Sequence, residues 1–306
     1  MSSVTVPTIN ISKLDLDTPE FVTEFGAAFQ EWGFVGITGH EIEQSVILKA
    51  MDSAEWFFNL PMSEKRQYQQ KKSWARGYVP LGTETAKGSK YSDLKEFYHL
   101  GRDNADEHGL EGNVWPDHPG FVSSFKRLHQ ELDTLSVKVL RAMAMYLGLD
   151  SEFFSEKIAS GEALLRVLHY PPITDPQAPN VRAAAHEDIN LITLLVGSEQ
   201  EGLEVLSRRG QWVPITMIEG TIICNLGDMM QRLTNGKLPS TTHRVVNPKG
   251  ARGRQSRYSV PFFVHPDPAM SLACLPQCCD VNNPKQYPDL SAGDYHQQRL
   301  REIGFK

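Results

Sequence analysis

The sequence lacks the features that would place the protein in a membrane or a secretory pathway. Among its 306 residues there is no run of about eighteen uninterrupted apolar residues, so no segment is expected to cross a bilayer. Residues 1–7, MSSVTVP, lack the basic start and the apolar stretch of a signal peptide. We therefore expect a soluble, cytoplasmic protein that makes no membrane contact.

Cysteine is scarce and positive charge is not in excess. Of the four cysteines, Cys224 stands alone, while Cys274, Cys278 and Cys279 lie near the C-terminus. Adjacent cysteines suit neither a disulfide framework nor a zinc ribbon, so we expect reduced thiols whose role the sequence does not show. With 31 Lys and Arg against 37 Asp and Glu, the formal net charge is −6, which gives no reason to bind nucleic acid.

The N-terminal third is predicted to alternate strands and helices. Thr18 and Pro19 are typical of a helix start, and apolar side chains follow at helical spacing from Phe21 to Phe29. A second helix is predicted over 47–58, with short strands over 6–11 and 34–37. Residues 71–120 are predicted to be long loops with one strand over 94–100. From Phe125 to Leu147 apolar residues recur every three or four positions, which predicts the clearest helix of the chain.

Beyond about residue 162, short β-rich runs dominate the sequence. Strands are predicted over 164–170, 191–196, 203–206, 212–215, 221–224 and 256–264. Many short strands joined by turns favour a barrel or jelly roll over a parallel sheet. The expected fold class is therefore α+β, with a helix-rich N-terminal region and a barrel-like C-terminal part.

Three residues could form a metal site. In an extended segment His186 and Asp188 project to the same side, and His243 follows 55 residues after Asp188. Two histidines and one carboxylate are the ligands of non-haem Fe(II) oxygenases, which keep other positions open for a co-substrate and O₂. Zinc hydrolases use a similar ligand set, so the three residues alone do not fix the metal.

A second pair of residues could bind an anion. Arg257 and Ser259 share one face of the strand predicted over 256–264. A guanidinium with a neighbouring hydroxyl is a good receptor for a carboxylate, because arginine can donate two parallel hydrogen bonds. If this face points inward, Arg257 is a buried cation that needs an anionic partner.

Taken together, these motifs resemble the isopenicillin N synthase-like branch of the Fe(II)/2-oxoglutarate-dependent dioxygenases. The matching stretches, in the order typical of that family, are VPTINISKL (6–14), EWGFVGITGH (31–40), RGYVPLG (76–82), RVLHYPP (166–172), HEDINLITLL (186–195), NLGDMMQRLTNGKLPSTTHRVV (225–246) and RYSVPFF (257–263). The likeness covers most of the chain and fades after about Pro268.

The resemblance implies a double-stranded β-helix (jelly-roll) core with the helix-rich N-terminal region packed around it. It implies that His186, Asp188 and His243 bind Fe(II). The predicted regions are an N-terminal helix and strand region over 1–125, a long supporting helix and connection over 126–160, an Fe(II)/2-oxoglutarate jelly-roll domain over 161–268, and a tail with a short helix over 269–306. Asp188 argues against a halogenase, because halogenating relatives lack this carboxylate.

The resemblance also implies a co-substrate pocket. Arg257 and Ser259 would hold the distal carboxylate of 2-oxoglutarate, and the hydroxyl of Tyr170 would assist. Asn225 lies at a position often near the metal. Leu168 is a departure, because many relatives carry Asn there as a further polar contact.

The implied activity is an oxygenase with Fe(II) as cofactor and 2-oxoglutarate and O₂ as co-substrates. It would couple oxidative decarboxylation of 2-oxoglutarate to succinate and CO₂ with hydroxylation, desaturation or ring closure of a small molecule. Two alternatives stay open. One is an isopenicillin N synthase-type iron oxidase that does not use 2-oxoglutarate, in which an Arg-x-Ser pair meets the substrate carboxylate. The other is a non-catalytic metal- or ligand-binding protein, which the intact set of five site residues disfavours.

The substrate and the oligomeric state are not readable from the sequence. Candidate substrate contacts, by analogy with the family, are Arg76, Tyr78, Tyr91, Phe97 and Phe262. An inward-pointing Arg76 would indicate an acidic substrate group. The histidines at 99, 169 and 265 are interpreted as ordinary strand or loop residues. A short helix in the C-terminal tail is predicted either to cover the barrel or to pack on a neighbouring molecule.

Overall fold

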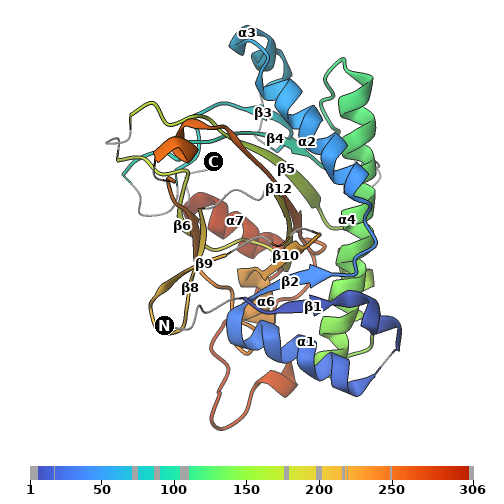
Figure 1. Ribbon diagram of the computed structural model, residues 1–306. Helices are drawn as coiled ribbons and strands as arrows, with labels where there is room; N and C mark the ends of the chain where they lie inside the picture. The colour runs from blue at the N-terminus through green and yellow to red at the C-terminus, as the bar shows by residue number, and fades with distance from the viewer. Residues whose placement is uncertain are drawn as a thin grey trace.

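The protein is built from two sheets that face each other, with helices against the outer side of the larger sheet (Figure 1). A computed structural model describes residues 6–16, 18–70, 75–85, 90–103, 110–175, 179–197, 202–215, 218, 220–248 and 250–302. The larger sheet has eight strands in the order β1 (Thr8–Asn10), β2 (Phe34–Thr38), β10 (Ile222–Leu226), β7 (Ile192–Gly197), β12 (Arg257–Val264), β5 (Ala163–Tyr170), β4 (Glu96–Leu100) and β3 (Gly77–Val79). The smaller sheet has four strands in the order β6 (Ala183–His186), β11 (His243–Val245), β8 (Leu203–Leu206) and β9 (Trp212–Pro214).

The two faces of the larger sheet have different partners, because side chains alternate along each strand. On β12, Val260, Phe262 and Val264 point outward into a core shared with the helices. Tyr170 on β5 belongs to a second apolar cluster between the sheets. The predicted α+β class with a jelly-roll core is confirmed, and strands β1 to β4 of the N-terminal region extend the same large sheet.

Of the helices in the described part of the chain, α1 (Pro19–Trp32), α2 (Gln44–Phe58) and α4 (Pro119–Tyr146) cover the outer side of the larger sheet (Figure 1). The other described helices are α3 (Met62–Lys65), α5 (Phe153–Ile158), α6 (Asp228–Leu233) and α7 (Ala292–Glu302). Short 3₁₀ helices lie at Ile11–Leu16, Arg66–Tyr68, Gly250–Arg254 and Pro276–Cys278. The helix start predicted at Thr18 and Pro19 is confirmed, since the Thr18 hydroxyl accepts a hydrogen bond from the Phe21 amide.

The longest helix, α4, begins earlier than the apolar pattern predicted. His118 caps it by accepting a hydrogen bond from the Phe121 amide at 2.9 Å, and Pro119 occupies the first turn. A helix can thus start before its apolar face becomes regular. The predicted boundary between residues 125 and 126 falls inside this helix.

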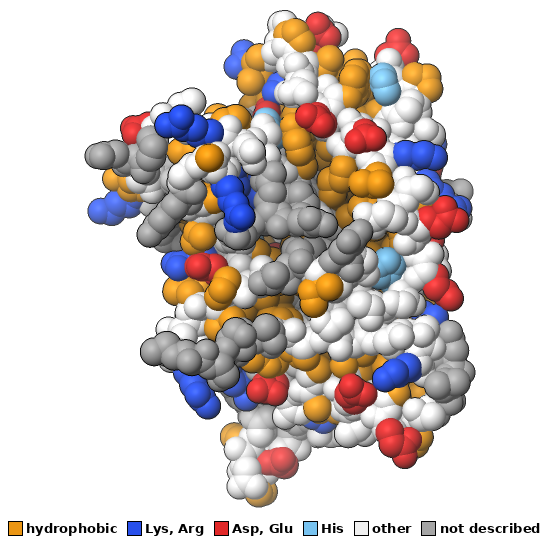
Figure 2. Space-filling view, in the orientation of Figure 1, with side chains coloured by type: hydrophobic (Ala, Val, Ile, Leu, Met, Phe, Trp, Pro, Cys, Tyr) orange, Lys and Arg blue, Asp and Glu red, His pale blue; other side chains and the backbone are white. Residues whose placement is uncertain are grey.

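The C-terminal helix α7 packs against α6. The Tyr295 hydroxyl donates to Asp228 at 2.9 Å, and the Arg299 guanidinium pairs with the same carboxylate at 3.0 Å. The tail helix therefore packs on another helix of its own chain. No helix among the described residues is long and apolar enough to cross a membrane. On the face shown in Figure 2, acidic and basic side chains are interspersed.

Candidate metal centre and the cavity beside it

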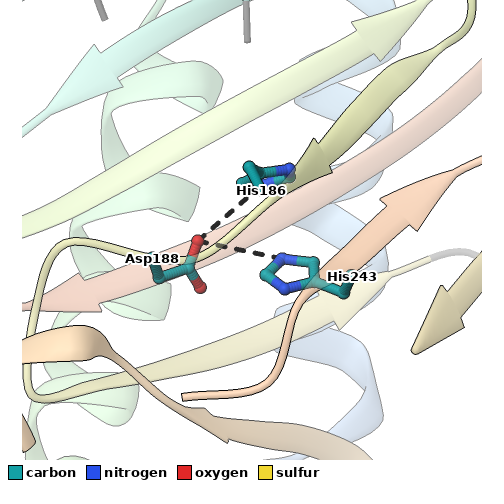
Figure 3. A group of neighbouring side chains, drawn as sticks. All are labelled: His186, Asp188 and His243. Atoms are coloured by element: carbon teal, nitrogen blue, oxygen red, sulfur yellow. Dashed lines mark ion pairs between the residues drawn. The ribbon is translucent and has the colours of Figure 1, made fainter. Parts of the chain in front are cut away.

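Three side chains from two segments of the chain come together at the ends of strands β6 and β11. His186 ends β6, Asp188 follows it by two residues, and His243 begins β11 (Figure 3). The pairing of β6 with β11 sets His243 directly opposite His186. Each histidine Nε2 lies 3.8 Å from Asp188 Oδ1, and the three ligand atoms lie within 4.8 Å of one another.

Backbone hydrogen bonds orient both imidazoles. His186 Nδ1 lies 2.8 Å from the Ala184 carbonyl, and His243 Nδ1 lies 3.2 Å from the Thr241 carbonyl. A carbonyl can only accept, so each Nδ1 carries the proton and each Nε2 turns a lone pair towards the centre. Burial, together with the adjacent His186, lowers the pKa of His243 to about 4, which keeps this ring neutral at neutral pH.

Two donors hold the carboxylate of Asp188. Its Oδ2 accepts hydrogen bonds from Thr193 Oγ1 and Asn225 Nδ2, both at 2.7 Å, which leaves Oδ1 facing the imidazoles. Burial opposes the charge of Asp188. The two neighbouring histidines and the two hydrogen bonds outweigh burial, so its pKa lies below the usual value. The site therefore offers one ionised carboxylate oxygen and two imidazole nitrogens, a donor set that fits Fe(II).

A buried arginine, Arg257, lies on the strand β12 opposite Tyr170. Arg257 and Tyr170 are directly paired across β12 and β5, and the guanidinium carbon of Arg257 lies 5.1 Å from the Tyr170 ring centroid. Arg257 is 3% exposed, and its Nη1 donates to Ser259 Oγ at 3.3 Å. Its Nε is buried with no hydrogen-bond partner among the described residues. A buried cation without a carboxylate partner fits an anionic ligand.

A cavity of about 920 Å³ opens beside the metal centre. His186 and Asp188 line it, as do Phe97, Arg166 and Phe263 on the interior face of the larger sheet. Helix α7 contributes a further part of its wall, through Ala292, Gly293, His296, Arg299 and Leu300. The C-terminal helix thus forms part of a cavity that reaches two of the three ligand side chains.

Comparison with known proteins places these features in one family. A model described as the 2OG-Fe(II) oxygenase superfamily matches residues 161–266, and one described as the N-terminal region of a non-haem dioxygenase in morphine synthesis matches residues 6–118. A 2-oxoglutarate-Fe(II) type oxidoreductase of Emericella nidulans is 33% identical over 90% of this chain and 83% of its own length. The chain belongs to the 2OG-Fe(II) oxygenase superfamily. It is also 33% identical to the proline hydroxylase buaE of Petromyces alliaceus, over 92% of each protein.

Solved structures of other members of the superfamily have the same fold as this protein. A 2OG-Fe(II) oxygenase family protein from Caulobacter crescentus is similar with a TM-score of 0.89 and 45% identity, over 99% of this chain and 100% of that one. A full-length Neurospora crassa protein solved in complex with alpha-KG and thymine has a TM-score of 0.87 and 29% identity, over 98% and 97%. The protein is therefore an Fe(II)- and 2-oxoglutarate-dependent oxygenase that uses O₂ and acts on a small molecule. The oxidase alternative without 2-oxoglutarate is not favoured.

Two of the residues expected to contact substrate in this oxygenase, Phe262 and Tyr78, point away from the cavity because side chains alternate along a strand. Phe262 is fully buried on the outer face of β12, edge-on to His129 at 5.0 Å, and its neighbour Phe263 lines the cavity instead. Tyr78 points outward on β3, packs against Phe57 and hydrogen-bonds Glu96. Neither side chain is among the described residues that line the cavity.

The other three substrate candidates differ in their positions. Phe97 lines the cavity, whereas Tyr91 is 49% exposed and is not among the described lining residues. Arg76 also lines the cavity, but its Nη2 pairs with Glu162 Oε2 at 2.6 Å. Because Glu162 already neutralises this guanidinium, Arg76 no longer indicates an acidic substrate group.

Several residues of the oxygenase site were missed by sequence reasoning. The Arg166 guanidinium lies between the rings of Phe97 and Phe263, 4.5 and 5.2 Å from their centroids, and its Nε donates to His99 at 2.7 Å. Strand alternation could have found Arg166, since it shares the interior face of β5 with Tyr170. Lys95, which pairs with Glu84 and Asp93 at 2.9 Å, had no such signal.

Asn225 and Leu168, two residues singled out by the family resemblance, lie close to the proposed metal and co-substrate residues. Asn225 lies beside the metal centre, bonded to Asp188. Leu168, where many relatives carry Asn, is buried in the apolar cluster between the sheets, and the backbone of β12 pairs it with Ser259. It adds no hydrogen bond to the receptor around Arg257.

Proposed function

We propose that His186, Asp188 and His243 are the three protein ligands of Fe(II) in this oxygenase. The observation that carries this assignment is their convergence. Within the described part of the chain they form the single group of three or more His, Cys, Asp or Glu side chains whose ligand atoms approach closely enough to share an ion. The Nδ1 hydrogen bonds fix both rings, and an ionised Asp188 supplies the negative charge.

We propose that Arg257, Ser259 and Tyr170 bind the distal carboxylate of 2-oxoglutarate. Arg257 offers buried donors with no carboxylate partner among the described residues, while Ser259 lies within hydrogen-bonding distance of it. The ring of Tyr170 lies beside this guanidinium, with its centroid 5.1 Å from the guanidinium carbon of Arg257. These residues orient the co-substrate, and bound Fe(II) supplies the activation of O₂ that makes substrate oxidation feasible.

The substrate is proposed to enter the 920 Å³ cavity, a volume suited to a small molecule. Of the candidates, Phe97 and Arg76 are retained as cavity residues, with Arg166 and Phe263 added. Two relatives support a small polar substrate: the Neurospora crassa protein was solved in complex with thymine, and buaE is named a proline hydroxylase. We propose hydroxylation as the outcome, with desaturation and ring closure as alternatives. No nucleic acid or membrane partner is proposed, because the formal net charge of −6 gives no reason to bind an anionic polymer or surface.

The remaining expectations stay predictions. The four cysteines are free, the state that a reducing compartment maintains, so a cytoplasmic location is retained as an expectation. The division into regions over 1–125, 126–160, 161–268 and 269–306 stays an interpretation of the chain order, and helix α4 crosses its first boundary.

Single substitutions test the metal assignment. His186→Ala, Asp188→Ala and His243→Ala should each abolish Fe(II)-dependent conversion of 2-oxoglutarate to succinate, measured by chromatography with and without candidate substrates. His40→Ala is the control, since this ring bonds the Gly220 carbonyl outside the site and its removal should leave turnover unchanged. Wild-type succinate formation in any of the three site variants would remove that residue from the ligand set.

A further inference from the structure

Arg182 is a buried cation that the metal centre and the substrate cavity do not use. It lies just before β6, and its side chain is fully buried. Its Nη2 donates to the Gln255 carbonyl at 2.9 Å, while Nε and Nη1 are buried without hydrogen-bond partners among the described residues. Within that same part of the chain it has no ion pair with a carboxylate. Such a group is expensive to keep in a folded protein.

The position of Arg182 makes this cost larger. Its guanidinium carbon lies 5.9 Å from the Tyr170 ring centroid, and that of Arg257 lies 5.1 Å from the same centroid. Two guanidinium groups therefore share one aromatic ring in the interior. Burial and the nearby charge of Arg257 lower the pKa of Arg182 to about 10, so Arg182 remains charged at neutral pH. Like charges in a medium of low dielectric repel each other strongly.

We propose that Arg182 is a second cation of the co-substrate pocket, a positioning residue that strengthens the binding of 2-oxoglutarate by acting with Arg257 on its distal carboxylate. The inference rests on the proposed role of Arg257, Ser259 and Tyr170. The repulsion between the two arginines is present in the ligand-free protein and is offset when an anion arrives. The repulsion destabilises the ligand-free protein, and a bound anion removes this destabilisation. The anion therefore binds more tightly than it would to a single arginine, while the ligand-free protein is less stable.

This electrostatic role differs from a structural one in the sign of its effects. If Arg182 only supports the fold, its replacement lowers stability and leaves co-substrate affinity alone. If it acts with Arg257, replacement by an apolar side chain of similar length weakens 2-oxoglutarate binding and leaves the empty protein as stable as before or more so. The Gln255 hydrogen bond is lost in both cases, so it cannot separate them.

The test uses Arg182→Met and Arg182→Lys in the full chain. Binding of 2-oxoglutarate is measured by calorimetry with the Mn(II)-loaded protein in the absence of O₂, and the unfolding midpoint is measured on the metal-free, ligand-free protein. In Arg182→Met we expect the dissociation constant to rise by about tenfold or more, with an unchanged or higher midpoint. Arg182→Lys, which keeps the charge and loses the planar fork, should fall between Met and wild type.

Arg232→Met is the matched control. Arg232 is also buried, lies over the rings of Tyr287 and Tyr295, and donates to one backbone carbonyl, that of Pro288 at 2.9 Å. Its replacement should lower the unfolding midpoint and leave 2-oxoglutarate affinity unchanged. Wild-type affinity in Arg182→Met overturns the inference, and so does a loss of affinity that comes with a lower midpoint or with failure to fold.

Arg257→Met separates this inference from the proposed function beneath it. If Arg257→Met loses 2-oxoglutarate binding and Arg182→Met does not, only the role of Arg182 is wrong. If neither variant changes 2-oxoglutarate binding, the carboxylate pocket itself has been misplaced. A loss in both, with opposite effects of Arg182→Met on affinity and on stability, supports the two-cation pocket.

Discussion

Asn225→Ala should weaken Fe(II) binding without removing any metal ligand. The Asn225 amide donates to Asp188 Oδ2 at 2.7 Å from a position that is 3% exposed, so no bulk water replaces it freely. A hydrogen bond to a charged group contributes about 1.5–3 kcal/mol. If that energy is lost from the metal-binding form, Fe(II) affinity falls by about 10–100-fold, the range usual for residues that hold a ligand from behind.

The assay is a competition titration of Fe(II) between the metal-free protein and a chromophoric chelator, without O₂. Thr193→Val should behave like Asn225→Ala, because Thr193 makes the other bond to Oδ2 at 2.7 Å. The double variant should lose more than the sum, since it leaves a buried carboxylate oxygen with no donor. Asn235→Ala, a buried asparagine that bonds the Cys278 carbonyl instead, should lower stability but not Fe(II) affinity. Unchanged affinity in both Asn225→Ala and Thr193→Val would refute the reasoning.

Two other predictions address the cavity wall. Phe262→Ala should lower the free energy of unfolding, measured in urea, by about 3–5 kcal/mol, because Phe262 is fully buried. Phe263→Ala should mainly raise the KM for substrate, because Phe263 lines the cavity. The reverse pattern would contradict the faces of β12 assigned to these two side chains. Burial opposes the charge of Glu84, but Arg166 and Lys95 hold the pKa of this carboxyl well below its usual value. The ionised Glu84 therefore contributes its full stabilisation above the unfolded-state pKa near 4.5. That stabilisation is lost as the pH falls towards the lower pKa of the folded protein. Glu84→Gln should therefore lower stability at neutral pH and reduce the acid-dependent loss below about pH 4.5, and an unaltered pH profile of unfolding would count against this ion pair.

The strands that build the site were predictable because their patterns are local. The runs over 164–170 and 256–264 are rich in Leu, Val and aromatic residues, and they form β5 and β12 with bounds within a residue of those expected. Alternation then assigns Arg257 and Ser259 to one face. Applied to the whole strand, the same rule would also have excluded Phe262, which has the opposite parity.

The sequence predicts which three residues could bind the metal, but it does not predict how they approach one another. The spacing of His186, Asp188 and His243 gave the ligand types, but their approach depends on the pairing of β6 with β11, two short strands that no periodic pattern marked. The placement of α7 against Asp228 is equally non-local. Arg182 gave no signal, because an isolated arginine in a sequence shows neither its burial nor its neighbours.

The most direct test of the central claim is an anaerobic titration of the Fe(II)-loaded protein with 2-oxoglutarate, followed by visible absorption. We predict a saturable metal-to-ligand charge-transfer band, which should be lost in Asp188→Ala and should require much higher 2-oxoglutarate concentrations in Arg257→Ala. The shift in Arg257→Ala corresponds to about 2–5 kcal/mol for a desolvated, charge-assisted contact. Absence of the band in the wild-type protein despite bound iron would contradict the account and would return an oxidase that does not use 2-oxoglutarate to first place.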